Sequence, residues 1–265
     1  MPARAWGFKS PLGHLSPLVA PLTRYAPTPS GFLHAGNLRN FQLTAALADE
    51  VGATIALRID DADAPRYRRE YVDAIFGVLI EHNLPWSVGP RDADDFEARW
   101  SQRARTGAYR EELQALRAVL PTYACTCSRT QQRTTPTGGC AAGCRTRGLP
   151  WVEGESALRV VVPEGTSVDV GGMSVALDEA LGDFVIWRRD GLPAYQLVSV
   201  IEDRDLGTTH IVRGEDLLAS SAAQVFLAPA LGADNVAEAT YVHHPLVLDD
   251  GGRKLSKSQH ASEER

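Results

Sequence analysis

Hydrophobic residues near the start of the chain recur first at the spacing of a strand and then at the spacing of a helix. Residues 23–26 have the composition of a short strand and lead into a turn rich in proline and glycine. After this turn, apolar side chains recur at helical intervals at Leu38, Phe41, Ala45 and Ala48. We therefore predict a strand, a tight turn and a helix.

The same alternation continues in the next segment. Residues 54–59 form a nearly continuous apolar run of the kind found in buried parallel strands. A helix is predicted over residues 67–82, and the apolar side chains expected on one of its faces are Val72, Ile75, Phe76, Leu79 and Ile80. A β-α-β-α order predicts an α/β fold, a Rossmann-like, doubly wound parallel sheet that binds a nucleotide beyond the carboxyl ends of its strands.

The alternation is interrupted in the middle of the chain. A helix predicted over residues 106–120 stops at Pro121, and strands are predicted at 157–162 and 184–189. The α/β pattern resumes after residue 190, with segments at 194–201, 209–212, 216–228 and 241–243. We predict a flexible extension over residues 1–22, a Rossmann-like domain formed by 23–120 and 191–265, and an inserted subdomain over 121–190.

Composition and charge narrow the class of protein. The chain has 265 residues, of which 44% are hydrophobic and 23% are charged, and its net charge is -6. An acidic protein cannot bind nucleic acid through bulk counterion release, so any RNA contact must be local. Neither a secretory signal nor a run of about 18 apolar residues is apparent. We expect a cytoplasmic protein without membrane contact, and a monomer.

All four cysteines fall in one short window, at Cys125, Cys127, Cys140 and Cys144. Two close pairs separated by a Gly/Thr-rich loop can place four thiolates around a tetrahedral zinc ion. Two disulfides or four unpaired thiols are the alternative interpretations. Because thiols stay reduced in the cytosol, we predict a structural zinc site.

Two further motifs carry the candidate chemistry. The segment 27–37 holds a His-x-Gly-Asn sequence where a helix is predicted to begin, and a helix N-terminus favours phosphate. The segment 254–258 has the sequence Lys-Leu-Ser-Lys-Ser. Their order and separation resemble the paired ATP-binding motifs of class I aminoacyl-tRNA synthetases.

The resemblance becomes more specific over residues 23–259. The segments 24–31, 58–63, 194–197, 211–218 and 254–258 are similar, in sequence and in order, to glutamyl-tRNA synthetases. The short length, the cysteine pattern and the run at 214–220 resemble the glutamyl-Q tRNA(Asp) synthetases, paralogues without an anticodon-binding domain. The chain ends at Arg265, soon after the lysine motif, and we expect no such domain.

The resemblance implies a reaction and a set of partners. Glutamate and ATP, with Mg²⁺, would give glutamyl-adenylate and pyrophosphate, and the glutamyl group would pass to queuosine in the anticodon of tRNA(Asp). It also implies a class I synthetase fold in which the zinc-containing insertion is an acceptor-type subdomain.

The resemblance also implies site residues. The expected catalytic residues are His34, Asn37 and Lys257. The expected ATP-binding residues are Gly36, Lys254, Ser256 and Ser258. The expected glutamate-binding residues are Arg24, Tyr25, Ala26, Pro27, Thr28, Asp60, Tyr195 and Arg213. Forked guanidinium groups suit carboxylates, and a carboxylate suits the ammonium group.

Without the resemblance, two of these residues would have ordinary structural roles. Arg213 would form an ion pair with Glu215 or Asp216, and Tyr195 would be a core aromatic residue.

Two positions depart from the family pattern. Asp60 stands where the family usually has glutamate, so we expect the ammonium contact to be completed by water or by Asp61. Cys140 stands where glutamyl-Q enzymes often have a tyrosine ligand, and a fourth sulfur favours zinc.

Three other functions are compatible with parts of the pattern. A minimal glutamyl-tRNA synthetase would charge a tRNA 3′ end. A small-molecule nucleotidylyltransferase would share the His-x-Gly motif but leaves the cysteine insertion unexplained. A non-catalytic, synthetase-derived RNA-binding zinc module would tolerate replacement of His34 or Lys257.

Overall fold

A computed structural model describes residues 20–247 except 133, 136 and 138. The helices are α1 (Ala35–Val51), α2 (Arg69–Glu81), α3 (Ala93–Asp95), α4 (Thr106–Val119), α5 (Arg129–Gln132), α6 (Leu177–Ala180), α7 (Tyr195–Leu206), α8 (Leu218–Leu227) and α9 (Asp234–Ala237). The strands are β1 (Leu22–Tyr25), β2 (Thr54–Leu57), β3 (Thr122–Cys125), β4 (Ala157–Val160), β5 (Ser167–Val170), β6 (Met173–Ala176), β7 (Phe184–Trp187), β8 (His210–Gly214) and β9 (Thr240–His244).

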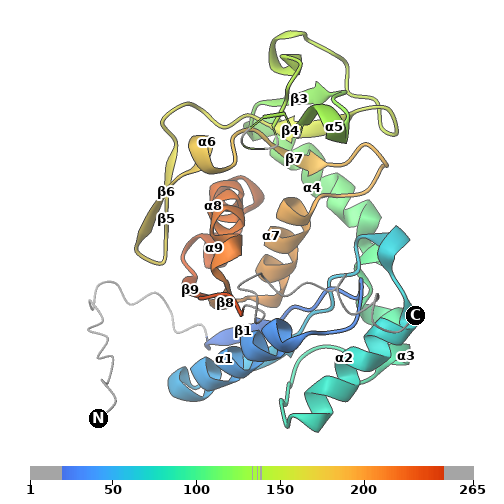
Figure 1. Ribbon diagram of the computed structural model, residues 1–265, viewed down its shortest axis with the longest axis vertical. Coiled ribbons are helices and arrows are strands. Elements are labelled where there is room, and N and C mark those ends of the chain that lie inside the picture. Colours follow the sequence, from blue (N-terminus) through green and yellow to red (C-terminus); the bar gives the residue numbers. More distant parts are fainter. Residues whose placement is uncertain (1–19, 133, 136, 138, 248–265) are drawn as a thin grey trace.

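Short parallel strands lie in the lower half of the molecule, above helix α1 (Figure 1). β1 pairs in parallel with β2, and β8 pairs in parallel with β9. The backbone N–H of Thr209 donates to the carbonyl of Leu22 at 2.9 Å, which joins the two pairs. An isolated parallel bridge between Ala56 and Val88 extends the layer beyond β2. The prediction of an α/β fold with parallel strands is confirmed, although the ladders are shorter than the apolar run at 54–59 indicated.

Helices α1 and α2 cover this layer and share a core with it. Phe41 of α1 packs against Tyr25 of β1 with ring centroids 5.3 Å apart. In α2, the buried side chains are Val72, Ile75, Phe76 and Leu79. Ile80, predicted on the same face, is 70% exposed. At 100° per residue, Ile80 lies about 90° from the centre of the buried stripe, so it falls at its edge.

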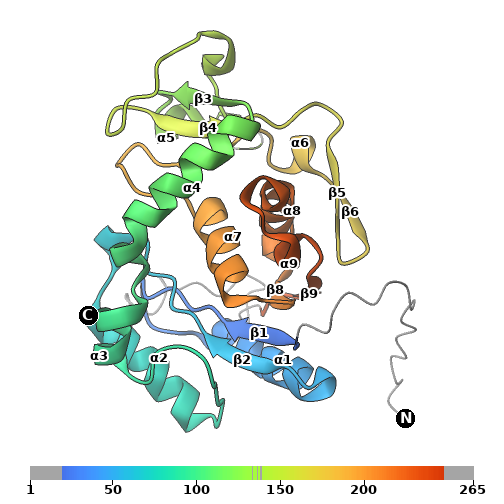
Figure 2. The ribbon, with the colours of Figure 1, turned by 180° about the vertical axis from the view of Figure 1, so that it is seen from behind.

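The segment that interrupts the α/β alternation forms a separate antiparallel sheet with strand order β3-β4-β7. Helix α4 runs from the base of the molecule up to this sheet (Figure 2). The predicted strands at 157–162 and 184–189 are confirmed as β4 and β7, each shorter than predicted. β3 was not predicted, because its four residues follow Pro121 without a clear periodicity.

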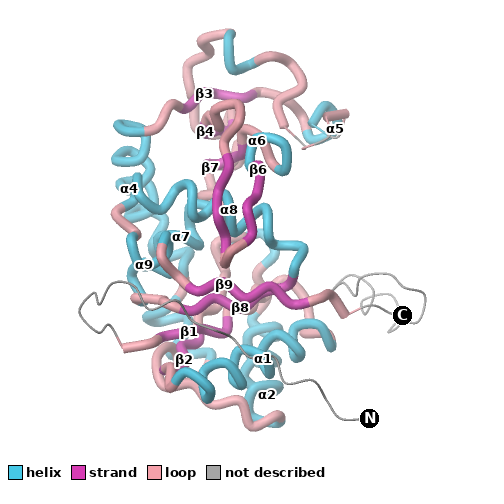
Figure 3. Tube along the Cα trace, turned by 90° about the vertical axis from the view of Figure 1, so that its left-hand side faces the viewer, coloured by secondary structure: helices cyan, strands magenta, loops and turns pink. Residues whose placement is uncertain are grey.

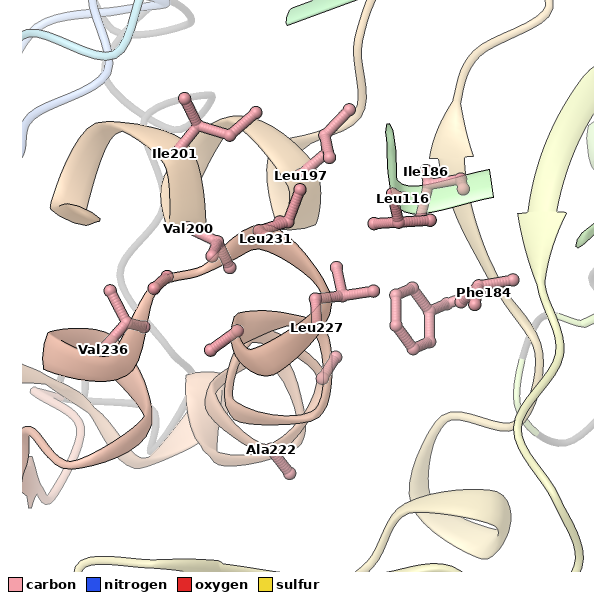
Figure 4. Packing of buried hydrophobic residues seen from close by; sticks show 14 of the residues in the cluster. Leu116, Phe184, Ile186, Leu197, Val200, Ile201, Ala222, Leu227, Leu231 and Val236 are labelled. Carbon is pink, nitrogen blue, oxygen red and sulfur yellow. The ribbon is translucent and has the colours of Figure 1, made fainter. Parts of the chain in front are cut away.

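The antiparallel sheet and helices α7 and α8 share one hydrophobic core (Figure 4). Phe184 and Ile186 of β7 belong to the same buried cluster as Leu197 of α7 and Leu227 of α8. The inserted segment is therefore fixed to α7 and α8 by apolar burial, the main favourable term in folding. The domain boundaries at residues 22, 120 and 190 stay predictions. Strand β1 begins at Leu22, one residue inside the predicted N-terminal extension.

A hairpin formed by β5 and β6 runs from the upper part of the molecule toward β9 (Figure 3). Its two-residue turn is Gly171–Gly172, and both glycines have positive φ angles. A Gly-Gly pair between alternating apolar residues is a hairpin signal that the sequence analysis missed. A Cβ atom on Gly171 would lie 2.6 Å from the carbonyl oxygen of Tyr241, so the turn packs directly against the backbone of β9.

Gly171→Ala should destabilise the protein by about 2–4 kcal/mol, because it combines an unfavourable backbone conformation with a clash against β9. Gly172→Ala is the matched control: its φ is also positive, but a Cβ there would have no heavy atom within 4 Å. We expect the control to lose only about 1 kcal/mol. Urea unfolding of both variants measures the difference, and equal losses would contradict the docking of the hairpin.

None of the described helices is both long enough and apolar enough to span a membrane.

Candidate active site

A cavity of about 420 Å³ opens at the carboxyl ends of the parallel strands. This is the edge where ligands bind in open α/β sheets. The predicted site residues that line it are Arg24, Ala26, Pro27, Thr28, His34, Gly36, Asn37, Asp60, Tyr195 and Arg213. Segments far apart in the sequence therefore meet at one cavity.

The His-x-Gly-Asn motif forms the start of helix α1. His34 is the N-cap residue, and its Nδ1 accepts the N–H of Gly36 at 3.1 Å. The N–H of His34 donates to Oδ1 of Asn37 at 3.1 Å, which completes a capping box. A Cβ atom on Gly36 would lie 2.9 Å from Cε1 of His34, so a larger residue here would displace the His34 ring from this position. Because Nδ1 accepts, a neutral His34 carries its hydrogen on Nε2 as a donor.

A chain of alternating charges lies beneath the cavity. Arg24 donates from Nε to Asp203 at 2.7 Å, and Asp203 also pairs with Nη1 of Arg58 at 2.8 Å. Arg58 then holds Asp60 with its Nε at 2.7 Å and its Nη2 at 3.0 Å. Burial alone would raise the pKa of the Asp203 carboxyl, but the guanidinium groups of Arg24 and Arg58 hold it well below its usual range. The chain thus orders Arg24 and Asp60 at the cavity wall.

Asp61 does not complete an ammonium contact, contrary to one of our expectations. Its side chain is buried and accepts hydrogen bonds from the Ser101 hydroxyl, the Gln102 N–H and the Arg103 guanidinium. These bonds fix the segment before α4. Asp60 is therefore the acidic residue of this pair that lines the cavity.

Arg213 and Tyr195 differ from their ordinary structural interpretations. The Nη1 atom of Arg213 donates to Oε1 of Gln224 at 2.7 Å and to Oγ of Ser221 at 3.2 Å. Both hydrogen-bond partners are neutral, and the buried Asp203 carboxylate is the anionic group that its charge influences, so the guanidinium has no direct anionic partner among the described residues and can bind a carboxylate at the cavity. Tyr195 is 42% exposed at the start of α7, so it is not a core aromatic residue.

One predicted glutamate-binding residue, Tyr25, does not line the cavity. Tyr25 is fully buried in the core behind β1, and its hydroxyl has no hydrogen-bond partner among the described residues. Strand alternation explains this correction, because Arg24 and Tyr25 must point to opposite faces. Four further predicted residues, Lys254, Ser256, Lys257 and Ser258, lie outside the described residues.

The structure adds residues that the sequence analysis did not assign. Asp203 is one of them, although an acidic residue on the buried face of a helix is a signal that could have been used. Asn40 and His244 are the others, since Asn40 Nδ2 lies 3.1 Å from His244 Nε2 and both line the cavity. This contact connects α1 to β9 beside the His34 loop, the segment 26–34 that links β1 to α1.

The four cysteines form a compact cluster at the far end of the molecule. Their sulfur atoms all lie within 4.8 Å of one another, and none of the four is in a disulfide. Cys127 Sγ is 3.7 Å from Cys140 Sγ and 3.8 Å from Cys144 Sγ. A tetrahedron with metal–sulfur bonds of about 2.3 Å has sulfur–sulfur edges of about 3.8 Å. The predicted set of ligands therefore fits a zinc ion.

Comparison with protein families gives a match over almost the whole chain. The model described as "tRNA synthetases class I (E and Q), catalytic domain" matches residues 21–263. A "Glutamyl-Q tRNA(Asp) synthetase" of Methylococcus capsulatus is 38% identical, over 88% of this chain and 74% of the relative. A "Glutamate--tRNA ligase 2" of Nitrosococcus oceani is 34% identical, over 89% of this chain and 53% of the relative.

Solved structures show the same similarity. The glutamate-tRNA synthetase of Elizabethkingia anophelis superposes with a TM-score of 0.72 at 25% identity, and the match covers 92% of this chain and 54% of that one. A glutamate tRNA ligase of Elizabethkingia meningosepticum, solved with its amino acid, gives a TM-score of 0.70 at 25% identity, covering 92% and 53% of the two chains. The chain thus spans about half the length of the glutamate–tRNA ligases and about three quarters of the glutamyl-Q relatives.

Proposed function

Since the chain belongs to the family of class I (E and Q) tRNA synthetase catalytic domains and is a ligase of that type, we propose that it activates glutamate with ATP and transfers the glutamyl group to queuosine in tRNA(Asp). The observation that carries this proposal is the shared cavity, where the His34 loop, two arginines and Asp60 converge. The names of the glutamyl-Q relatives support the choice of acceptor. ATP and tRNA as substrates imply a cytoplasmic reaction.

In the first step, an oxygen of the glutamate α-carboxylate attacks the α-phosphorus of ATP and pyrophosphate leaves. The carboxylate is already ionised, so the protein has to position two anions and stabilise the growing negative charge. The N-terminus of α1, with His34 and Asn37, supplies donors for phosphate, and Gly36 lets the nucleotide approach the backbone. Mg²⁺ and Lys257 would neutralise the departing pyrophosphate.

Glutamate would be recognised by charge. Arg24 and Arg213 are buried, cationic and directed to the cavity, so each can bind a carboxylate. Asp60 would accept from the ammonium group, and the Tyr195 hydroxyl would add a hydrogen bond. Of the other predicted contacts, Ala26, Pro27 and Thr28 form the adjoining wall through the backbone that follows β1.

In the second step, a hydroxyl oxygen of the queuosine ring attacks the carbonyl carbon of the glutamyl-adenylate. The carbon–oxygen bond to AMP breaks, AMP leaves, and the hydroxyl proton is released. This step consumes no further ATP. Acceptor choice therefore depends on which tRNA hydroxyl reaches the cavity.

The experiment that tests this function uses labelled glutamate, ATP and tRNA(Asp) with or without queuosine. Nucleoside mass spectrometry then locates the label. We expect it on queuosine, and only in the modified tRNA. Label on the 3′-terminal adenosine would instead identify a minimal glutamyl-tRNA synthetase. The similarity to a glutamate–tRNA ligase is the observation that favours this alternative. No label on either, from folded protein, would favour a non-catalytic RNA-binding module.

We also propose that Cys125, Cys127, Cys140 and Cys144 hold one structural zinc ion. The sulfur–sulfur distances support this assignment. Strand β3, which ends at Cys125, lies at the opposite end of the molecule from β1 and β8 (Figure 1), so this zinc ion would have a structural and not a chemical role. Zinc there would link β3 to the loop that returns to β4. An acceptor-type role of this subdomain, with the four thiolates as its scaffold, follows from the family resemblance.

Elemental analysis should find one zinc per chain, and Cys144→Ser should lose it. The free energy of zinc binding contributes directly to the stability of the segment that holds the ion. Loss of zinc should therefore make residues 121–150 of the variant accessible to protease. Ser128→Ala, at an exposed position beside the cluster, is the control and should keep its metal. Full protection of Cys144→Ser without zinc would contradict the proposal.

A further inference from the structure

We propose that Gln102 is a positioning residue for the amino-acid substrate, acting through Asp60 to fix where the ammonium group binds. This inference rests on the proposed glutamate-dependent function. It concerns a residue outside all of the sequence motifs described above. Gln102 begins a 3₁₀ turn (Gln102–Arg105) that leads into α4.

Gln102 is held rigidly. The residue is 1% exposed, and its backbone N–H donates to Oδ1 of Asp61 at 2.7 Å. Its side-chain oxygen accepts the N–H of Ala62 at 3.3 Å, which identifies the amide nitrogen as the other atom. That nitrogen, Nε2, donates to Oδ1 of Asp60 at 2.9 Å. A side chain bonded at both ends in this way has a single orientation.

The hydrogen bonds to Asp60 leave one acceptor position for a ligand. A carboxylate has about four lone-pair sites, two on each oxygen. Oδ1 receives Arg58 Nε at 2.7 Å and Gln102 Nε2 at 2.9 Å, so both of its sites are used. Oδ2 receives Arg58 Nη2 at 3.0 Å, which uses one more. The remaining site on Oδ2 is where an ammonium group would bind.

The loss of free acceptor positions on Asp60 matters because Asp60 also borders a second cavity. It has a volume of about 200 Å³ and shares Thr28, Asp60 and Tyr195 with the first cavity. Gln102 lines only the second cavity. By occupying Oδ1, Gln102 removes the competing acceptor position on the Asp60 carboxylate, so the ammonium group has one place to bind.

The test is Gln102→Met, which keeps the side-chain length and removes the amide donor. Calorimetry measures the binding of L-glutamate and of glutarate, which has both carboxylates but no ammonium group. We expect the dissociation constant for L-glutamate to rise about tenfold, the value of one hydrogen bond to a charged group. The dissociation constant for glutarate and the KM for ATP should each change less than twofold. Gln114→Met, at an exposed position on α4, should leave all three unchanged.

The ratio of the two dissociation constants does not depend on the fraction of folded protein, so partial destabilisation leaves the test valid. Gln102→Asn, whose amide is one methylene too short, should give the same change in ratio and serves if the methionine variant does not fold. Equal weakening of both ligands, or no change in either, would overturn the inference while the proposed function stands. Wild-type protein that binds neither glutamate nor glutarate would instead overturn the proposed function, and the inference with it.

Discussion

Arg213→Met is expected to lower kcat/KM for glutamate by about 10³-fold in ATP–pyrophosphate exchange. Arg213 is 4% exposed as a residue and lines the cavity, where a forked pair of charge-assisted hydrogen bonds to a carboxylate would form in a water-poor site. Two such bonds at about 2 kcal/mol each correspond to roughly this factor. The loss should appear in KM for glutamate, with KM for ATP little changed.

Arg117→Met is the matched control for this variant, since Arg117 is exposed on α4. It should retain wild-type exchange. Arg213→Lys keeps the positive charge but not the fork, so it should lie between the two. A kcat/KM for Arg213→Met within fivefold of wild type would show that glutamate is recognised elsewhere.

Asp203→Asn is expected to destabilise the protein by about 3–5 kcal/mol, a large part of the 5–15 kcal/mol typical of a folded domain. The substitution leaves Arg24 and Arg58 buried without their shared counter-ion. Because the folded-state pKa of Asp203 is depressed, its stabilising contribution is present above the unfolded pKa of about 3.9 and is lost as pH falls below it. Between neutral pH and acid pH, the free energy of unfolding should therefore fall less for the variant than for the wild-type protein.

Asp205→Asn is the matched control, two residues further along α7. Its carboxylate is 35% exposed and pairs with Arg105 and Arg204 at the surface. Such pairs contribute about 1 kcal/mol or less. Urea unfolding at pH 7 compares the two variants. Equal destabilisation by both would contradict the buried charge chain as the support of the cavity.

Local signals in the sequence predicted much of the architecture. The spacing of Leu38, Phe41, Ala45 and Ala48 predicted α1, and the order of strands and helices predicted the parallel layer. The four cysteines were predicted as one cluster because their spacing alone restricts where they can lie. These features succeed because the information is contained in short stretches of chain.

Tertiary packing decides the features that were missed or wrong. The pairing of Asp203 with Arg24 and Arg58 depends on three segments meeting, and no local pattern records it. Asp61 could not be separated from Asp60 by sequence, because their difference is which one faces Ser101 and Arg103. Tyr25 was assigned to the site with its whole motif, although strand alternation directs its side chain into the core.

The central claim is that the cavity forms an adenylate from glutamate and ATP. Purified protein, assayed for exchange of labelled pyrophosphate into ATP without any tRNA, tests it most directly. We predict exchange that requires L-glutamate and that glutamine and aspartate do not support. Folded, zinc-containing protein that shows no exchange with glutamate, or the same exchange with each amino acid, would contradict the account.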